Sequence, residues 1–255
     1  MLKQRLLHGE AALGCWLQLM SPLAAEIVAK VGFDCVMIDL EHGPGSISEA
    51  VQLMQALQGS GCAPLIRVPQ GDKAWLKRAL DAGAQGCMVP AVDGPEAARE
   101  AVSGSFFPPL GARGLAASAI RASDFGLRER EYLAQAVDGT LLICQIETAG
   151  GLAAAEEIAA LDGVDMLFVG PNDLAANLGH LGQLDHPDVV AATARVEAAA
   201  RGAGKLLGAI PTPDRSVADL KAAGYHLIMA EVDSLLLREG GLASVAAFRA
   251  AAGPN

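Results

Sequence analysis

Short apolar runs alternate with stretches rich in Ala, Leu and Glu along the whole chain, and this alternation restricts the fold more than any other feature. Eight of the apolar runs have the length of a strand within the 255 residues. They cover residues 14–19, 35–40, 64–68, 86–89, 141–146, 166–169, 206–210 and 226–230. Strands that alternate with helices pair in parallel, so the pattern predicts the α/β class and a (β/α)8 TIM barrel. We expect one domain over residues 1–255, because no linker interrupts the pattern.

The segments between the runs predict how each strand is entered. The sequences VGFD, AGAQ, DGVD and AGYH precede the second, fourth, sixth and eighth runs, and each fits a helix that ends in a glycine cap. Residues 3–11 predict a short first helix, and residues 235–252 predict closing helices. The connection over residues 102–131 is too long for a plain loop. We interpret it as an ordered lid or subunit contact, or else as a passive surface loop.

Composition excludes several classes of function. The net charge of −10 argues against a nucleic-acid surface, which needs clustered Lys and Arg. No apolar run approaches the roughly 18 residues of a membrane span, and the start, MLKQRLLHGE, is too short and polar for a signal peptide, so we expect a cytoplasmic protein. The five cysteines lack CxxC spacing and are interpreted as reduced packing residues. Neither GxGxxG after the first strand nor GxxxxGK[ST] occurs, so the sequence does not support the use of a dinucleotide or a nucleoside triphosphate.

Two neighbouring runs, LLICQIE and DMLFVGPND, each end in a carboxylate. The Ala-rich residues 151–160 between them predict the helical crossover of a βαβ unit, so the two strands should be parallel. Parallel neighbours lie about 4.8 Å apart. Glu147 and Asp173 would then meet at adjacent carboxyl ends, where a divalent cation is the natural shared ligand.

Polar residues also follow the second and third strands. Asp39, Glu41 and His42 come after the second, and Arg67 comes at the end of the third. Active sites of such barrels lie at the carboxyl ends of the strands, so these side chains are candidates for one site. Each also has a structural interpretation. His42 alone is more often a structural histidine than a catalyst, and Arg67 alone could form a surface ion pair.

The fifth and sixth strands add further candidates. Gln145 and Glu147 share a face by the period of two, and that face should be the barrel interior. After the sixth strand, backbone N–H groups at the start of the GPNDLAANLG helix are predicted to bind a substrate carboxylate. The residues predicted to bind substrate are Gln145, Gly170, Pro171, Asn172 and Asp173. Asp173 could instead cap the helix that follows it.

The remaining lysines and histidines narrow the chemistry. No lysine falls at the carboxyl end of a strand, so a Schiff-base mechanism has no candidate and carbanion chemistry would need a metal. The lysines are Lys3, Lys30, Lys73, Lys77, Lys205 and Lys221. The other histidines are predicted to be structural: His8, His180, His186 and His226.

Six segments occur in order: GFDCVMIDLEHGP, PLIRVP, LDAGAQGCMVPAV, FFPPLGARG, QIETAGG and GVDMLFVGPNDLAANLG. Together they resemble the HpcH/HpaI aldolase family, the metal-dependent class II pyruvate aldolases, from about Gly14 to about Gly208. The resemblance implies a barrel enzyme that reversibly cleaves a 4-hydroxy-2-oxo acid to pyruvate and an aldehyde. Members act on 4-hydroxy-2-oxoheptanedioate or 2-dehydro-3-deoxyglucarate. They commonly form homohexamers, trimers of dimers, with exchanged C-terminal helices.

The resemblance also implies roles for individual residues. Glu147 and Asp173 would bind Mg²⁺, Mn²⁺ or Co²⁺, and Arg67 would contact the keto oxygen. His42 would serve acid–base catalysis, and Gln145 would lie beside the pyruvate. A further residue, Asp81 in LDAGAQG, matches a family aspartate that reaches the site of a neighbouring subunit near the histidine.

Two other functions fit the same residues. A CoA-thioester lyase of the citrate-lyase β type shares the fold and the metal pair, but its N-terminal Arg-Ser motif has no counterpart here. A non-catalytic protein that binds 2-oxo acids would retain the metal pair without turnover. For an aldolase, we expect the aldehyde to contact a far wall that includes Leu19, Ile210 and Pro211.

Overall fold

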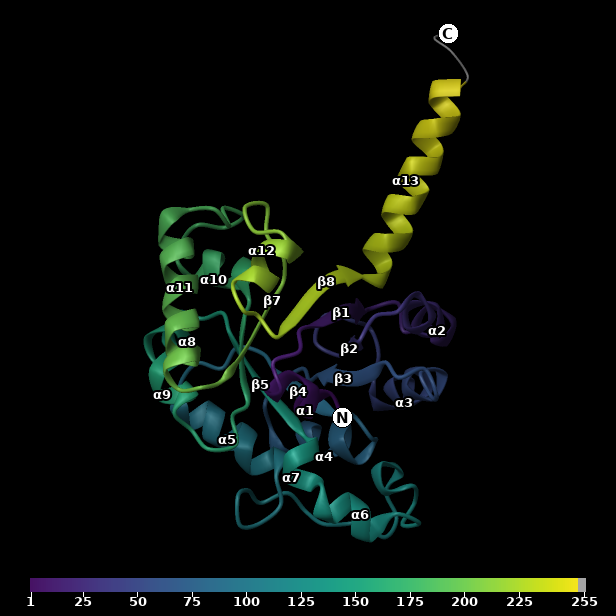
Figure 1. Cartoon of the computed structure of the whole chain (residues 1–255), viewed down its shortest axis with the longest axis vertical. Helices are drawn as coiled ribbons and strands as arrows, with labels where there is room; N and C mark the ends of the chain where they lie inside the picture. Colours follow the sequence, from purple (N-terminus) through teal and green to yellow (C-terminus); the bar gives the residue numbers. More distant parts are fainter. Residues whose placement is uncertain (252–255) are drawn as a thin grey trace.

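Eight parallel strands close into one barrel in chain order, which confirms the predicted (β/α)8 architecture. The computed structural model describes residues 1–251 (Figure 1). Each strand hydrogen-bonds to the next, and β8 returns to pair with β1. The strands are β1 (Ala12–Leu17), β2 (Cys35–Asp39), β3 (Ala63–Arg67), β4 (Gly86–Val89), β5 (Leu141–Ile146), β6 (Met166–Val169), β7 (Leu206–Ala209) and β8 (Leu227–Val232).

Helices surround the barrel and begin where their sequences favour a start. Pro22, Pro95, Pro171 and Pro187 each occupy the first position of a helix, where the missing N–H costs nothing. The helices are α1 (Leu2–Leu7), α2 (Pro22–Val31), α3 (Ile47–Ala56), α4 (Lys73–Asp81), α5 (Pro95–Ser105), α6 (Glu129–Ala134), α7 (Ala136–Gly139), α8 (Ala149–Ala153), α9 (Ala155–Ala159), α10 (Pro171–Asn177), α11 (Pro187–Gly202), α12 (Val217–Ala222) and α13 (Asp233–Ala251), with a 3-10 helix at Arg121–Ser123.

Most predicted boundaries agree with the structure to within two residues. The first strand begins at Ala12, two residues earlier than predicted, and the last ends at Val232, two residues later. The four glycine preambles do end in a left-handed turn, with φ between 81° and 110°. The predicted crossover helix at residues 151–160 is instead two short helices, α8 and α9, because Ala154 departs from helical geometry with φ −102° and ψ 14°.

The apolar core has two layers. Alternate strand residues, among them Met37, Leu65 and Phe168, fill the barrel interior, and the others pack outward against the helices. Helix α1 closes the amino end of the barrel, where Leu2 and Leu6 join the interior cluster. The interior is therefore filled by side chains, and space for a ligand is left only at the carboxyl end.

The long excursion after α5 lies at the amino end of the barrel. It joins the end of α5 to the start of β5, and Arg121 donates from Nη1 to the carbonyl oxygen of Ala82, just past the end of α4, at 2.7 Å. Helix α4 leads from there into β4, so this contact is at the entry of the strands. The prediction that the excursion acts as a lid is wrong for this chain, because it follows a helix rather than a strand. Its use as a subunit contact stays a prediction.

Helix α13 projects away from the barrel as a single helix of 19 residues (Figure 1). The predicted C-terminal segment ran to residue 252, which lies outside the described residues. Every residue of α13 from Leu235 onward is exposed, including Leu237 at 69% and Phe248 at 76%. Among residues 1–251, no helix is long and apolar enough to cross a membrane.

Candidate active site

Glu147 follows directly after β5 and is held in place by two hydrogen bonds. Its Oε1 accepts from the backbone N–H of Ala91 at 2.7 Å, and its Oε2 accepts from Nε2 of Gln145 at 2.5 Å. Ala91 has a left-handed φ of 48°, which turns the chain after β4. Glu147 is only 5% exposed and Gln145 only 4%. The pairing of β4 with β5 and the turn at Ala91 therefore fix the orientation of the Glu147 carboxylate.

The start of α10 brings the second acid to the same place. Asp173 lies in the first turn of this helix and is exposed to solvent. Gly170 allows the close approach of the two strands here, because a Cβ on this residue would lie 2.4 Å from Oε2 of Glu147. Asp173 and Glu147 are close enough for the charge of one to raise the pKa of the other. The predicted pair thus converges at the mouth of the barrel.

Arg67 is locked across the mouth by a bidentate ion pair with Asp39. Nε and Nη2 of Arg67 lie 2.9 and 2.7 Å from the two carboxylate oxygens of Asp39, and both side chains are buried. Gln18 donates to the same carboxylate at 2.8 Å. The guanidinium also lies over the ring of Trp16, 4.4 Å from its centroid. Nη1 is the one guanidinium nitrogen that these two hydrogen bonds to Asp39 do not use.

Nη1 of Arg67 lies 3.1 Å from Oε2 of Glu41, the residue before His42. Nε2 of His42 is 3.9 Å from the same Glu41 oxygen, and the His42 side chain is 61% exposed. Its backbone N–H donates to Asp39 at 3.2 Å. His42 is therefore anchored through its backbone while its ring faces solvent at the mouth.

The electrostatics of the mouth favour a bound cation. Burial, together with the charges of Glu41 and Asp173, raises the pKa of Glu147 to about 7, although the Ala91 N–H and Arg67 act in the opposite direction. Burial also raises the pKa of Glu41, against the pull of Arg67. Three carboxylates thus share the positive charge of Arg67, which is already paired with Asp39. An oxygen-rich, net negative pocket of this kind suits a hard divalent cation.

A cavity of about 370 Å³ opens above these groups. Of the predicted site residues, Gln145, His42 and Arg67 line this cavity. The predicted substrate-binding residues at the start of α10 also line it: Gly170, Pro171, Asn172 and Asp173. Of the predicted far wall, Ile210 and Pro211 line the cavity, but Leu19 does not. Leu19 lies beyond the end of β1, and its place is taken by Val232 of β8 and Leu235 of α13.

Asp81 is a predicted catalytic residue that lies away from the cavity. It ends α4 at the amino side of the barrel, where Arg113 donates to it at 2.5 Å. Arg113 also donates to the hydroxyl of Tyr132 at 2.7 Å. Asp81 therefore lies apart from the mouth of its own barrel, and its contribution to a neighbouring subunit stays a prediction.

Sequence reasoning did not assign a role to three residues that support the site. Asp39 was noted at a strand end, but its pairing with Arg67 depends on the register in which these two residues are partners. The apolar pattern predicts the first strand two residues too late, so it does not show that Gln18 comes directly after the end of β1. Ala91 acts through its backbone, and no side-chain pattern signals a left-handed alanine.

The chain is similar to known proteins along most of its length. The model of the HpcH/HpaI aldolase/citrate lyase family matches residues 12–239. A hydroxypyruvate/pyruvate aldolase of Chromohalobacter salexigens is 37% identical over 243 residues, 95% of each chain. A 5-keto-4-deoxy-D-glucarate aldolase of Salmonella paratyphi A is 40% identical over 206 residues, 81% of this chain and 80% of its own.

A solved structure supports the same assignment. An HpcH/HpaI aldolase/citrate lyase family protein from Burkholderia cenocepacia superposes with a TM-score of 0.91 at 41% identity, covering 97% of this chain and 98% of its own. The fold and the acid-lined mouth define a (β/α)8 barrel protein whose polar side chains gather at the carboxyl ends of its strands. This chain belongs to the HpcH/HpaI aldolase/citrate lyase family.

Proposed function

We propose that this protein is a class II pyruvate aldolase, a carbon–carbon lyase that reversibly cleaves a 4-hydroxy-2-oxo acid to pyruvate and an aldehyde. The relatives named as pyruvate, hydroxypyruvate and keto-deoxy sugar acid aldolases support the reaction class. The observation that carries the proposal is the convergence of Glu147 and Asp173 beside Arg67 at one barrel mouth.

Glu147 and Asp173 are the residues that would hold the divalent cation, Mg²⁺, Mn²⁺ or Co²⁺. The fit rests on the raised pKa of Glu147 and on the unpartnered Oε1 of Gln145, a buried acceptor that faces the cavity. When bound, the cation supplies Lewis-acid polarisation of a 2-oxo acid. Carboxylates from only two side chains leave room for a substrate carboxylate and keto oxygen.

The chain's own residues supply the rest of the chemistry. Arg67, held by Asp39, presents Nη1 where negative charge develops on the keto oxygen during cleavage of the C3–C4 bond. His42 would accept the proton of the C4 hydroxyl and return it during addition. Glu41 lies beside it, with Oε2 3.9 Å from Nε2 of the ring. Gly170 and Asn172 line the wall that would face the substrate carboxylate.

A direct experiment tests this function. Protein stripped with a chelator should lose pyruvate release from a 4-hydroxy-2-oxo acid and regain it when Mg²⁺ or Mn²⁺ is added. Pyruvate can be followed with a coupled dehydrogenase assay. Full activity without metal would rule out the metal-dependent reaction, and no activity with any 4-hydroxy-2-oxo acid tested would favour a non-catalytic binder.

The composition of the cavity disfavours the CoA-thioester alternative. Nucleotide phosphates need several cationic side chains, whereas Arg67 is the one Arg or Lys among the residues that line the mouth. Arg67 is moreover already paired with Asp39 and Glu41. A small 2-oxo acid with one carboxylate matches this supply of positive charge better.

We also propose that the protein is a homo-oligomer, a hexamer built as a trimer of dimers with exchanged α13 helices. Exposed apolar side chains on α13, such as Leu237 and Phe248, support this assembly because they have no apolar cover in one chain. A second exposed apolar row lies on α2, where Leu23, Ile27 and Val31 are 64–71% exposed. In such an assembly Asp81 would approach the mouth of a neighbouring barrel.

We place the reaction in the cytoplasm. All five cysteines, Cys15, Cys35, Cys62, Cys87 and Cys144, are buried free thiols. Burial raises the pKa of Cys15, Cys87 and Cys144 to about 12, which keeps these thiols protonated and unreactive. Their use as packing residues, as the sequence predicts, supports a reducing compartment.

A further inference from the structure

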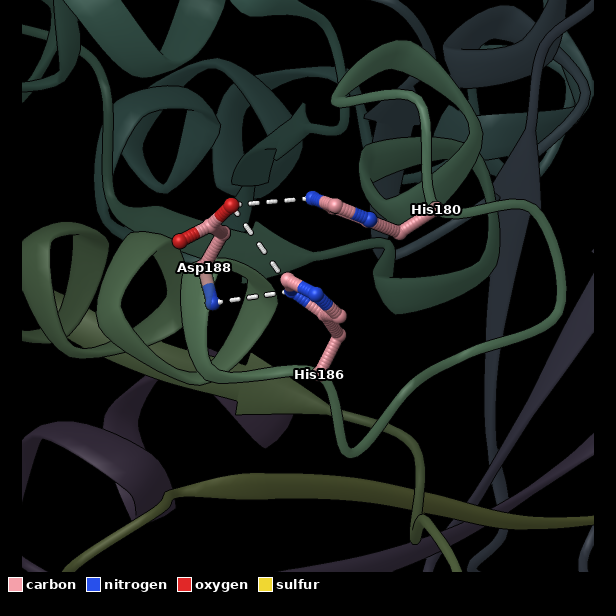
Figure 2. Close-up of side chains that lie close together, drawn as sticks. All are labelled: His180, His186 and Asp188. Atoms are coloured by element: carbon pink, nitrogen blue, oxygen red, sulfur yellow. Dashed lines mark hydrogen bonds and ion pairs between the residues drawn. The ribbon is translucent and has the colours of Figure 1, made fainter.

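The loop between α10 and α11 brings together two histidines and an aspartate that the proposed aldolase site does not use. His180 and His186 belong to the loop, and Asp188 lies in the first turn of α11 (Figure 2). One potential ligand atom from each of the three lies within 4.8 Å of the others. None of the three lines the cavity at the barrel mouth.

The two imidazole rings point toward one carboxylate oxygen. Nε2 of His180 is 2.9 Å from Oδ2 of Asp188, and Nδ1 of His186 is 3.7 Å from the same oxygen. The rings are stacked, with centroids 3.5 Å apart and planes inclined by 16°. Figure 2 shows the carboxylate of Asp188 beside both rings. One carboxylate oxygen of Asp188 therefore lies close to a ring nitrogen of each histidine.

The backbone of the loop holds this arrangement. The N–H of His180 donates to Ala175 at the end of α10, at 2.8 Å. Gln183 donates to the carbonyl of His180 at 2.9 Å, and His186 donates to that of Gln183 at 3.1 Å. Two turns, each with a left-handed glycine, allow the chain to reverse here. Both histidines are thus fixed relative to the start of α11 before any ligand binds.

The donor set suits a borderline transition metal rather than Mg²⁺. Two imidazole nitrogens and one carboxylate are typical ligands of Zn²⁺, which binds them at about 2.0–2.2 Å. Two ligand atoms of a tetrahedral Zn²⁺ site with bonds of that length lie about 3.3 Å apart. The distances from Oδ2 of Asp188 to the nitrogens of His180 and His186, 2.9 and 3.7 Å, bracket this value. Mg²⁺ prefers oxygen ligands, which the acid pair at the mouth supplies.

The hydrogen bonds also agree with coordination. Nδ1 of His186 accepts from the backbone N–H of Asp188 at 3.2 Å, so this nitrogen is the unprotonated one of the ring, and a cation bound to it would replace this hydrogen bond. Nε2 of His180 faces the Asp188 carboxylate as a donor, and a cation would replace the proton between them. The Asp188 side chain is 67% exposed, which leaves the site open to solvent and to a water as fourth ligand.

We propose that His180, His186 and Asp188 form a second metal site, selective for Zn²⁺ or a similar transition metal, separate from the acid pair of the barrel mouth. A cation bound here would tie the end of α10 to the start of α11. Helix α10 carries Asp173 in its first turn, so the site would brace the helix that presents this acid. The proposal does not depend on the aldolase function.

Zinc binding to the full chain tests this site. The double variant E147Q/D173N removes the acid pair at the mouth, and after dialysis against Zn²⁺ it should retain about one metal ion per chain. When H180A or H186A is introduced into this double variant, its affinity for Zn²⁺ should fall by on the order of tenfold or more. H8A is the matched control, since His8 is exposed and distant in sequence, and it should change nothing. No retained Zn²⁺ in E147Q/D173N, or equal retention in H180A and H186A, would overturn the proposal.

A second measurement needs no substitution. In the wild-type chain with excess Mg²⁺, added Zn²⁺ should shift the imidazole resonances of His180 and His186 in a histidine-labelled NMR spectrum, while those of His8 and His226 stay in place. Shifts confined to His42, or no histidine shift at all, would contradict a site in the loop.

Discussion

The barrel mouth and helix α13 use their side chains in opposite ways. At the mouth, charged groups are buried: Glu147 is 5% exposed and Arg67 is 7% exposed, and each has a polar partner. On α13, apolar groups are exposed, with Leu237 at 69% and Phe248 at 76%. Buried charge that is fully partnered marks a preorganised site, whereas exposed apolar surface on a long helix marks an interface.

This difference assigns ligand binding to the barrel mouth and assembly to α13. The groups that would bind metal and 2-oxo acid meet within one barrel, because parallel strands deliver their carboxyl ends to one rim. In the proposed assembly another subunit would cover α13, since within residues 1–251 this helix is exposed from Leu235 onward. Substitutions at the mouth should therefore change catalysis without changing assembly, and substitutions on α13 should change assembly first.

The largest effect is expected for Glu147→Gln. The amide keeps the size of the side chain but removes one of the two charges for the cation, and activity should fall by about a thousandfold or more. Pyruvate release at saturating Mn²⁺ gives the activity, and light scattering gives the mass of the assembly, which should not change. Glu157→Gln, on the exposed face of α9, is the matched control. If E147Q kept its activity, the proposed catalytic role of the barrel mouth would be contradicted.

Arg67→Lys should have the next largest effect. Lysine cannot keep the two hydrogen bonds to Asp39 while presenting a third donor to the site. We expect kcat to fall by about a hundredfold, in line with the loss of a donor to a developing oxyanion. Arg99→Lys, an exposed residue of α5, controls for the substitution itself. Unchanged kcat in R67K would mean that Arg67 only packs against Trp16.

A double substitution on α13, Leu237→Glu with Phe248→Glu, should reduce the mass of the assembly. The charges cannot be covered by an apolar partner surface, so light scattering should report a smaller species than in the wild type. Mn²⁺ binding at the mouth should persist, because no side chain of α13 beyond Leu235 reaches the cavity. Ser244→Glu adds the same charge to the same helix at a polar position. An unchanged mass in the double variant would refute the exchanged helix.

The smallest effect concerns stability against acid. Burial raises the pKa of Asp39, but the hydrogen bonds and charge of Arg67 more than offset this and hold that pKa below its usual value. The pair therefore stabilises the fold above the unfolded pKa of 3.8, and this contribution is lost as the pH falls through the folded pKa. Asp39→Asn should cost about 1.5–3 kcal/mol of unfolding free energy at pH 7.

Denaturant unfolding between neutral and acidic pH measures this contribution. The difference between the wild type and D39N should shrink as the pH is lowered, since protonation removes the same charge from the wild type. A difference that stays constant down to the lowest pH would contradict a stabilising ion pair at the mouth.

The positions of Glu147 and Asp173 can be predicted from the sequence because strand ends are local features. Glu147 and Asp173 each follow an apolar run, and the closure of the barrel brings the two ends together. The support of Arg67 by Asp39 depends on the register between β2 and β3, which apolar patterns do not determine. The long excursion was misplaced because its sequence does not reveal that α5 comes before it.

Other features escaped prediction because they depend on tertiary placement. His180 and His186 were predicted to be structural, since nothing in their spacing shows that the loop stacks the two rings beside Asp188. Likewise, the sequence predicts helical structure near residues 235–252, but it does not show that one continuous helix, α13, projects away from its own barrel.

Deuterium exchange of the pyruvate methyl group tests the central proposal most directly, since it needs neither the natural aldehyde nor the full reaction. In D₂O with Mg²⁺ or Mn²⁺, the protein should catalyse loss of the methyl proton signal, and E147Q or a chelator should stop it. Exchange that proceeds equally without metal, or no exchange by the metal-loaded wild type, would contradict an enolising metal site formed by Glu147 and Asp173.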